Sequence, residues 1–178
     1  MTILKSIFLV FLTLIFFILE ISIPVIPMGV SLIFVLLVVL LIQTAKDDKN
    51  IRRSGLKYVF LTCVLGGILL DCYSVFPPGL FLLSLLIVSY FSEKFLLSKF
   101  NINKILSILI FSLTIALIYQ FLILIFSYCF YFLGLLDFRI YLDKFYWLSI
   151  FQAVILNGLL ITMFSSGLKL IKSKYKYE

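Results

Sequence analysis

Long apolar runs separated by short charged segments constrain this chain more than any other feature of its sequence. A helix that crosses the hydrocarbon core of a bilayer, roughly 30 Å thick, needs about 20 mostly apolar residues. Six runs predict such helices, over residues 6–23, 28–44, 58–76, 80–97, 105–134 and 146–168. The sequence therefore predicts an all-α, polytopic membrane protein of about six transmembrane helices, built as a single integral membrane domain over residues 1–178.

The composition supports lipid as the solvent of these helices. Hydrophobic residues make up 64% of the chain and charged residues 13%, whereas soluble domains are about half apolar and about a quarter charged. The first run is too long for the apolar part of a signal peptide, and no small-residue cleavage pattern follows it, so we expect a retained helix. The fifth run exceeds one crossing, so we expect it to tilt or to continue past the bilayer.

The positions of lysine and arginine predict the orientation. With six crossings, only Arg139 and Lys144 fall on one side of the membrane, and the other thirteen of the fifteen basic residues fall on the opposite side. Loops on the cytoplasmic side carry the excess of basic residues, so both termini are expected in the cytoplasm. The net charge of +7 has the same explanation. Because the basic residues cluster between apolar runs rather than along one stripe, we expect no nucleic-acid partner.

Small and polar residues recur inside the apolar runs at the spacing of one helix face. Residues three, four, seven or eight apart lie on the same side of a helix, and in lipid such stripes mark contacts between helices. We therefore predict that four stripes face inward. They are Ser6, Thr13 and Glu20; Cys63, Gly67, Asp71 and Ser74; Ser112, Ala116, Gln120 and Ser127; and Ala153, Asn157 and Ser165.

Two acidic residues near the outer ends of their runs need an explanation. A charge at the bilayer centre costs about 2.5–3.5 kcal/mol, and less toward the edge. For Asp71 two alternatives stay open: a carboxylate that accepts hydrogen bonds near the turn at residues 77–79, or a contact or gating residue. For Glu20 we favour a structural role at the end of its helix.

The sequence contains no pattern that supports catalysis. It has no histidine, which excludes a His-based metal site or catalytic triad. The three cysteines lack a CxxC spacing: Cys63 and Cys129 are predicted to pack inside, and Cys72 lies nearer an outer edge without a predicted disulfide. No nucleophile elbow or phosphate-binding glycine loop is present. We therefore expect no enzymatic activity and no catalytic, cofactor-binding or metal-binding residues.

One segment resembles a known family signature. It reads Gly67-Ile-Leu-Leu-Asp71-Cys-Tyr-Ser74-Val-Phe-Pro77-Pro-Gly79, and it is similar to the Gly-x3-Asp-x2-Ser-x2-Pro-x-Gly pattern at the end of the third helix in MreD, the bacterial rod-shape-determining membrane protein family. The break at Pro24 with a glycine soon after, and the basic loop after the second run, also resemble that family. The chain departs from the family where members often have a proline–acidic pair, because Met28 follows Pro27 here.

This resemblance implies a function and a set of partners. It implies a non-enzymatic scaffold of the bacterial cell-elongation (rod) complex, in the bacterial cytoplasmic membrane, that supports peptidoglycan synthesis and regulates cell shape. The implied partners are the bitopic scaffold MreC, the polymerase RodA with its penicillin-binding transpeptidase, and indirectly the actin-like MreB. The residues Gly67, Asp71, Ser74, Pro77 and Gly79 would have structural or interaction roles.

Two alternatives accompany that expectation. The six-helix fold of the MreD family resembles the substrate-binding subunits of energy-coupling-factor vitamin transporters, so such a subunit is the first alternative. A vitamin site needs convergent polar groups in a pocket, and few polar residues together with short outer loops favour the scaffold instead. The second alternative is a small proton-coupled transporter that uses Asp71, but the sequence offers no second central carboxylate for a proton relay.

Overall fold

All regular elements in the described part of the chain are helices. The structure, a computed structural model, describes residues 2–22, 30–45, 49–96, 104–136 and 144–174. The elements are α1 (Thr2–Ser22), α2 (Leu32–Ala45), α3 (Lys49–Tyr73), α4 (Leu80–Phe91), the π-helical segment η1 (Ser92–Leu96), α5 (Ile105–Phe132) and α6 (Lys144–Lys174). The predicted all-α class is confirmed for these residues, which contain no strand.

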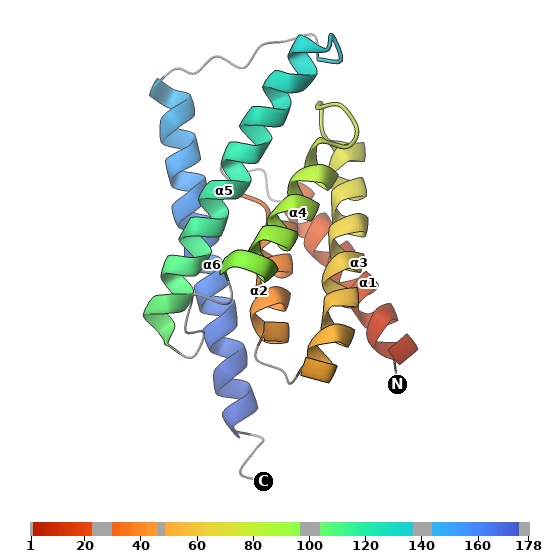
Figure 1. The fold of residues 1–178 in the computed structure, drawn as a ribbon, viewed down its shortest axis with the longest axis vertical. Coiled ribbons are helices and arrows are strands. Elements are labelled where there is room, and N and C mark those ends of the chain that lie inside the picture. The colour runs from red at the N-terminus through yellow and green to blue at the C-terminus, as the bar shows by residue number, and fades with distance from the viewer. Residues whose placement is uncertain (1, 23–29, 46–48, 97–103, 137–143, 175–178) are drawn as a thin grey trace.

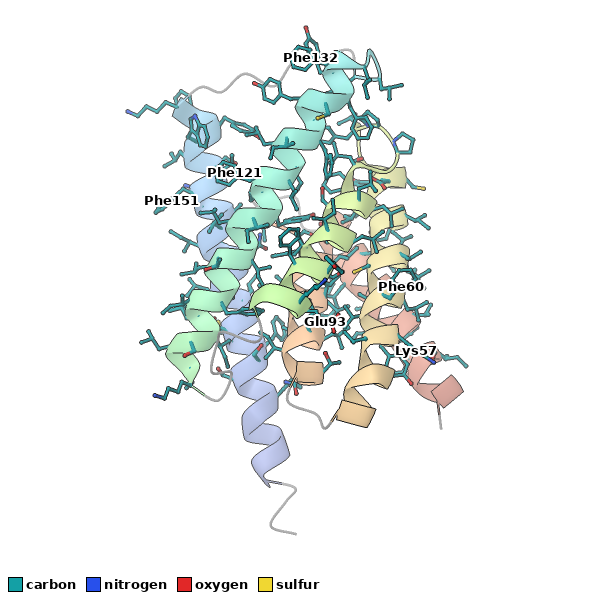
Figure 2. All side chains as sticks on the ribbon, viewed as in Figure 1. Lys57, Phe60, Glu93, Phe121, Phe132 and Phe151 are labelled. Carbon is teal, nitrogen blue, oxygen red and sulfur yellow. The ribbon has the colours of Figure 1, made fainter. Side chains whose placement is uncertain are left out.

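Several of these helices are suited to lipid by length and composition. Among the described residues, three helical segments are long and apolar enough to cross a membrane: Gly55–Tyr73, Ile105–Phe132 and Lys144–Leu168. Two shorter apolar segments are Ser6–Ser22 and Leu32–Thr44. Large apolar side chains also cover the outside of the bundle, where a soluble protein would expose polar ones. Phe60, Phe121, Phe132 and Phe151, labelled in Figure 2, are between 43% and 81% exposed.

Helix α2 lies at the centre of the bundle. It packs against α1, α3, α4 and α6, and Figure 1 shows it enclosed between α3 and α6 behind α4. Its side chains from Ile33 to Ile42 are almost all buried, because a helix that is apolar on every side can be covered all round. The ring of Phe34 stacks on that of Tyr119 in α5, with centroids 4.4 Å apart. The chain thus wraps its other helices around one apolar helix.

The apolar runs located every described helix but not every helix end. Helix α3 begins at Lys49 instead of residue 58, and α6 continues to Lys174 instead of ending at 168. Hydropathy marks only the part of a helix that lipid or protein covers, and the helix continues into the charged flanks. At 28 residues, α5 is about 42 Å long, which is more than one crossing of about 30 Å requires.

Two further boundaries have local causes. Helix α2 begins at Leu32 instead of residue 28, because Ser31 acts as its N-cap: the Ser31 hydroxyl accepts a hydrogen bond from the Phe34 N–H at 3.3 Å. Helix α4 ends at Phe91, and the π-helical segment η1 continues the run predicted over 80–97 as far as Leu96. The loop predicted at residues 24–28, the break at Pro24 and most of the loop at 137–144 lie outside the described residues.

The small and polar stripes face the interior, as predicted. Three stripes are buried along most of their length, and on α1 only Thr13 is fully buried while Ser6 and Glu20 are half-buried. The buried polar and small members are Cys63, Asp71, Ser112, Ala116, Gln120, Ser127, Ala153, Asn157 and Ser165. Between α5 and α6, the Ser112 hydroxyl bonds to the Gly158 carbonyl at 3.0 Å. In lipid the hydrophobic effect does not drive helices together, and small and polar groups provide the contacts between helices instead.

Glycines bring neighbouring helices unusually close together, as at Gly67 and Gly158. A Cβ atom added at Gly67 of α3 would lie 2.6 Å from the Cα atom of Leu82 in α4, and one added at Gly158 of α6 would lie 2.6 Å from a side-chain carbon of Leu113 in α5. No side chain fits at such a distance from backbone. Gly67 therefore sets the separation of α3 and α4.

We expect Gly67→Leu to disrupt the α3–α4 contact, because the new side chain must displace the α4 backbone. Overpacking of this kind costs about 1–3 kcal/mol or more. Ile68→Leu is the matched control, because Ile68 is the neighbouring residue and is 46% exposed. Thermal unfolding of the two purified variants in detergent measures the difference. Equal unfolding temperatures for the Gly67 variant and the wild type would contradict the close approach.

Candidate functional site

The carboxylate of Asp71 joins the end of α3 to the start of α4. One oxygen, Oδ2, accepts hydrogen bonds from the backbone N–H of Gly79 at 2.9 Å and of Leu82 at 3.3 Å. The other, Oδ1, accepts one from the N–H of Phe81 at 2.9 Å. Asp71 is 9% exposed. Both oxygens are therefore occupied by backbone donors in a buried position.

These bonds supply the hydrogen-bond acceptors that the first N–H groups of a helix lack. The first N–H groups of an α-helix have no partner within the helix, and Gly79, the N-cap of α4, has no side chain that could accept them. Asp71 provides the acceptor from eight residues earlier. The Leu80 N–H donates to the Pro77 carbonyl at 3.4 Å, and the Leu83 N–H begins the helical pattern with Gly79 at 2.9 Å. The negative carboxylate also suits the positive end of the helix dipole.

The connection between the end of α3 and the start of α4 is called the α3–α4 joint below. The other residues of the family-like motif belong to this joint as well. The Ser74 hydroxyl donates to the Asp71 carbonyl at 3.3 Å, and Gly79 has a φ of +100°, a conformation that residues with a Cβ rarely adopt. Gly67 provides the close approach of the two helices one turn earlier. The structure thus brings all five predicted motif residues into one α3–α4 unit. Of the two alternatives for Asp71, it confirms the hydrogen-bonding one; a contact with a partner stays a prediction.

Glu20 performs the same task between α1 and α2. Its Oε2 atom accepts a hydrogen bond from the Ile33 N–H at 3.2 Å and one from the Ser31 hydroxyl at 3.4 Å. Like Asp71, Glu20 is the third residue from the end of its helix. The structural role predicted for Glu20 is confirmed, but its partner α2 was not foreseen. A signal existed: each acidic residue is followed, eight or nine residues later, by the glycine of a Pro-x-Gly sequence.

A third helix is attached to the same point. The Ser31 N–H donates to the Asn157 side-chain oxygen of α6 at 3.3 Å, and Asn157 is fully buried. Ser31 therefore connects α1, α2 and α6 through one residue. This explains the polar stripe of α6, which was predicted to make a helix contact.

A cavity of about 800 Å³ lies beside these connections. It is lined mainly by apolar and aromatic side chains from all helices except α2, together with the residues just before α2, and seven of the lining residues are aromatic. Of the few polar residues that the sequence offers for a vitamin site, Glu20, Ser74 and Gln120 line this cavity, whereas Asp71 and Asn157 do not. The sequence did not foresee a cavity of this size, because its walls come from segments far apart in the chain.

The remaining candidate chemistry is limited in the described part of the chain. No group of three or more His, Cys, Asp or Glu side chains lies close enough there to hold a metal ion. Cys63 is buried, Cys72 and Cys129 are exposed, and all three described cysteines are free. The prediction that Cys129 packs inside is wrong. In lipid an outward-facing cysteine is as stable as an apolar residue, so hydrophobicity alone does not indicate which way it faces.

The chain was also compared with known proteins. No protein-family model, curated protein or solved structure matches it. The resemblance to the MreD family therefore depends on residues 67–79 and the general layout of the helices, and the similarity of fold to transporter subunits stays a prediction.

We expect Asp71→Ala to destabilise the protein by about 2 kcal/mol or more, because three backbone N–H groups lose their acceptor. Asp71→Asn should fall between alanine and the wild type, since its amide keeps one oxygen and places an NH₂ group against the remaining donors. Thermal unfolding in detergent orders the three proteins. Thr114→Ala, at a half-buried threonine that bonds to its own helix, is the control. If the alanine variant were as stable as the wild type, the hydrogen bonds of Asp71 would not stabilise the connection between α3 and α4.

Proposed function

We propose that this chain is a non-enzymatic, six-span membrane scaffold of the bacterial cell-elongation complex that supports peptidoglycan synthesis and cell shape. The observation that carries the proposal is the single α3–α4 joint formed by Gly67, Asp71, Ser74, Pro77 and Gly79. Gly67, Asp71 and Gly79 fix the geometry of the joint, and Ser74 and Pro77 add local hydrogen bonds to it. A motif used in this way suits a protein whose task is to present a rigid surface to partners.

The hydrogen bonds of Asp71 also argue against proton transport. Both of its oxygens accept backbone N–H groups, so a proton bound to either oxygen would disturb the hydrogen bonds at the start of α4. A proton carrier needs a carboxylate that gains and loses its proton without such damage. The scaffold proposal instead expects the joint to shape a surface for MreC, for RodA with its penicillin-binding transpeptidase, and indirectly for MreB.

The topology of the proposal is six crossings with both termini in the cytoplasm. In Figure 1 the starts of α1 and α3 and the end of α6 lie toward the lower end of the bundle, and the α3–α4 turn and the start of α6 lie at the upper end. This arrangement fits an even number of crossings. Lys57, labelled in Figure 2, lies toward the lower end, which the proposal assigns to the cytoplasm because of the excess of basic residues.

The cavity favours a second candidate function. A volume of about 800 Å³ is within the usual range of small-molecule sites. A substrate-binding subunit of an energy-coupling-factor vitamin transporter would need such a cavity, whereas a scaffold does not. This candidate is therefore kept beside the scaffold.

Co-purification after mild detergent extraction distinguishes the two candidates. We expect the wild type and Thr114→Ala to retain MreC and RodA, and Asp71→Ala to lose them at equal membrane abundance, because the joint is broken. Retention of an ATPase-coupled transporter module instead would establish the second candidate. Retention of MreC and RodA by Asp71→Ala would show that the joint does not shape their contact surface.

The topology has its own test in intact cells. In a variant whose native cysteines are replaced, a cysteine introduced at Ile140 should react with a membrane-impermeant reagent, and one at Asn50 should react only after the cells are opened. The reverse pattern would contradict the orientation. Reaction of both positions in intact cells would contradict six crossings.

A further inference from the structure

The cavity contains a buried polar group that lacks a partner. The Tyr119 side chain is 1% exposed and lines the cavity. Its hydroxyl is turned toward Ser31 but has no hydrogen-bond partner among the described residues. An unpaired buried hydroxyl costs about 1–3 kcal/mol, and such groups in native proteins need an explanation. A ligand that bonds to Tyr119 would provide one.

The cavity is also lined by one charged group that can accept a further hydrogen bond. Glu20 is the only charged side chain among the described residues that line it. The Oε2 atom accepts the bonds from the Ser31 hydroxyl and the Ile33 N–H, and the Leu32 N–H also bonds to this carboxylate. A carboxylate has about four lone-pair sites, so Glu20 can accept a further donor. The lining therefore combines a negatively charged acceptor and the Tyr119 hydroxyl with a wall that is mainly apolar and aromatic.

We propose that this cavity binds an amphipathic amine, a small molecule with an apolar body and an ammonium group that donates hydrogen bonds to Glu20 and Tyr119. The proposal stands independently of the scaffold function. Aromatic rings supply seven of the lining residues, and aromatic faces attract ammonium groups as well as apolar bodies. An anionic ligand would meet the Glu20 carboxylate without any lining cation among the described residues.

Three probes with one apolar body test the chemical class. They are 4-phenylbutylamine, 4-phenylbutanol and 4-phenylbutyrate, added to the full chain in phosphatidylcholine nanodiscs. Binding is followed by the fluorescence of Trp147, the only tryptophan of the chain, which adjoins the lining residues Phe145 and Tyr146. We expect saturable binding of the amine, about tenfold weaker binding of the alcohol and no binding of the acid. Equal responses to all three probes, or tightest binding of the acid, would overturn the proposal.

Two conservative variants test the two contacts. Glu20→Gln keeps an acceptor for the start of α2 and should weaken amine binding about tenfold. Tyr119→Phe keeps the stacking on Phe34 and should weaken it severalfold, yet raise the unfolding temperature of the ligand-free protein because an unpaired hydroxyl is removed. A general loss of structure cannot produce these opposite signs. Amine binding in both variants equal to that of the wild type would contradict the site.

The same substitutions elsewhere provide the controls. Glu93→Gln and Tyr131→Phe change residues outside this cavity, and both should bind the amine like the wild type. Adding phosphatidylethanolamine to the nanodiscs identifies the source of the ammonium group: loss of amine binding would indicate a lipid headgroup, and unchanged binding would indicate a free small molecule.

Discussion

The first backbone N–H groups of a helix must find acceptors inside the protein when water is absent, and the fold of this chain depends on how it meets that requirement. Asp71 provides acceptors for α4, and Glu20 provides one for α2. In both cases the carboxylate belongs to the preceding helix. The bonds that complete one helix therefore also fix its position against the helix before it.

The central position of α2 follows from the same arrangement. Its start is held by Glu20 from α1 and, through Ser31, by Asn157 from α6. Along its length, small residues of α3 allow close contact, as where Gly66 faces Ile33. In lipid, close packing and interhelical hydrogen bonds together hold helices against each other. The hydrogen bonds at the start of α2 therefore add to its packing in holding it in the core.

The sequence predicted the parts of the fold that have periodic or compositional signals. It predicted the helices, the inward stripes and the close approach at Gly67, because lipid leaves few other roles for small residues. It did not predict the start of α3 at Lys49, because charged residues outside lipid form helix as readily as apolar ones. The bond from Glu20 to α2 and the cavity were also missed, since each depends on how helices cross. The hydropathy of a segment carries no information about the angle at which its helix packs against another helix.

The start of α2 and the cavity are connected through Glu20. One oxygen of this carboxyl group fixes the start of α2, and the same side chain lines the cavity beside Tyr119. Any ligand that binds only the assembled bundle stabilises that assembly by its binding free energy. Occupancy of the cavity is therefore linked to the arrangement of α1, α2 and α6 around Ser31. The proposed partner surface and the proposed ligand site are compatible in this architecture, because the helices that would form the surface are also the walls of the cavity.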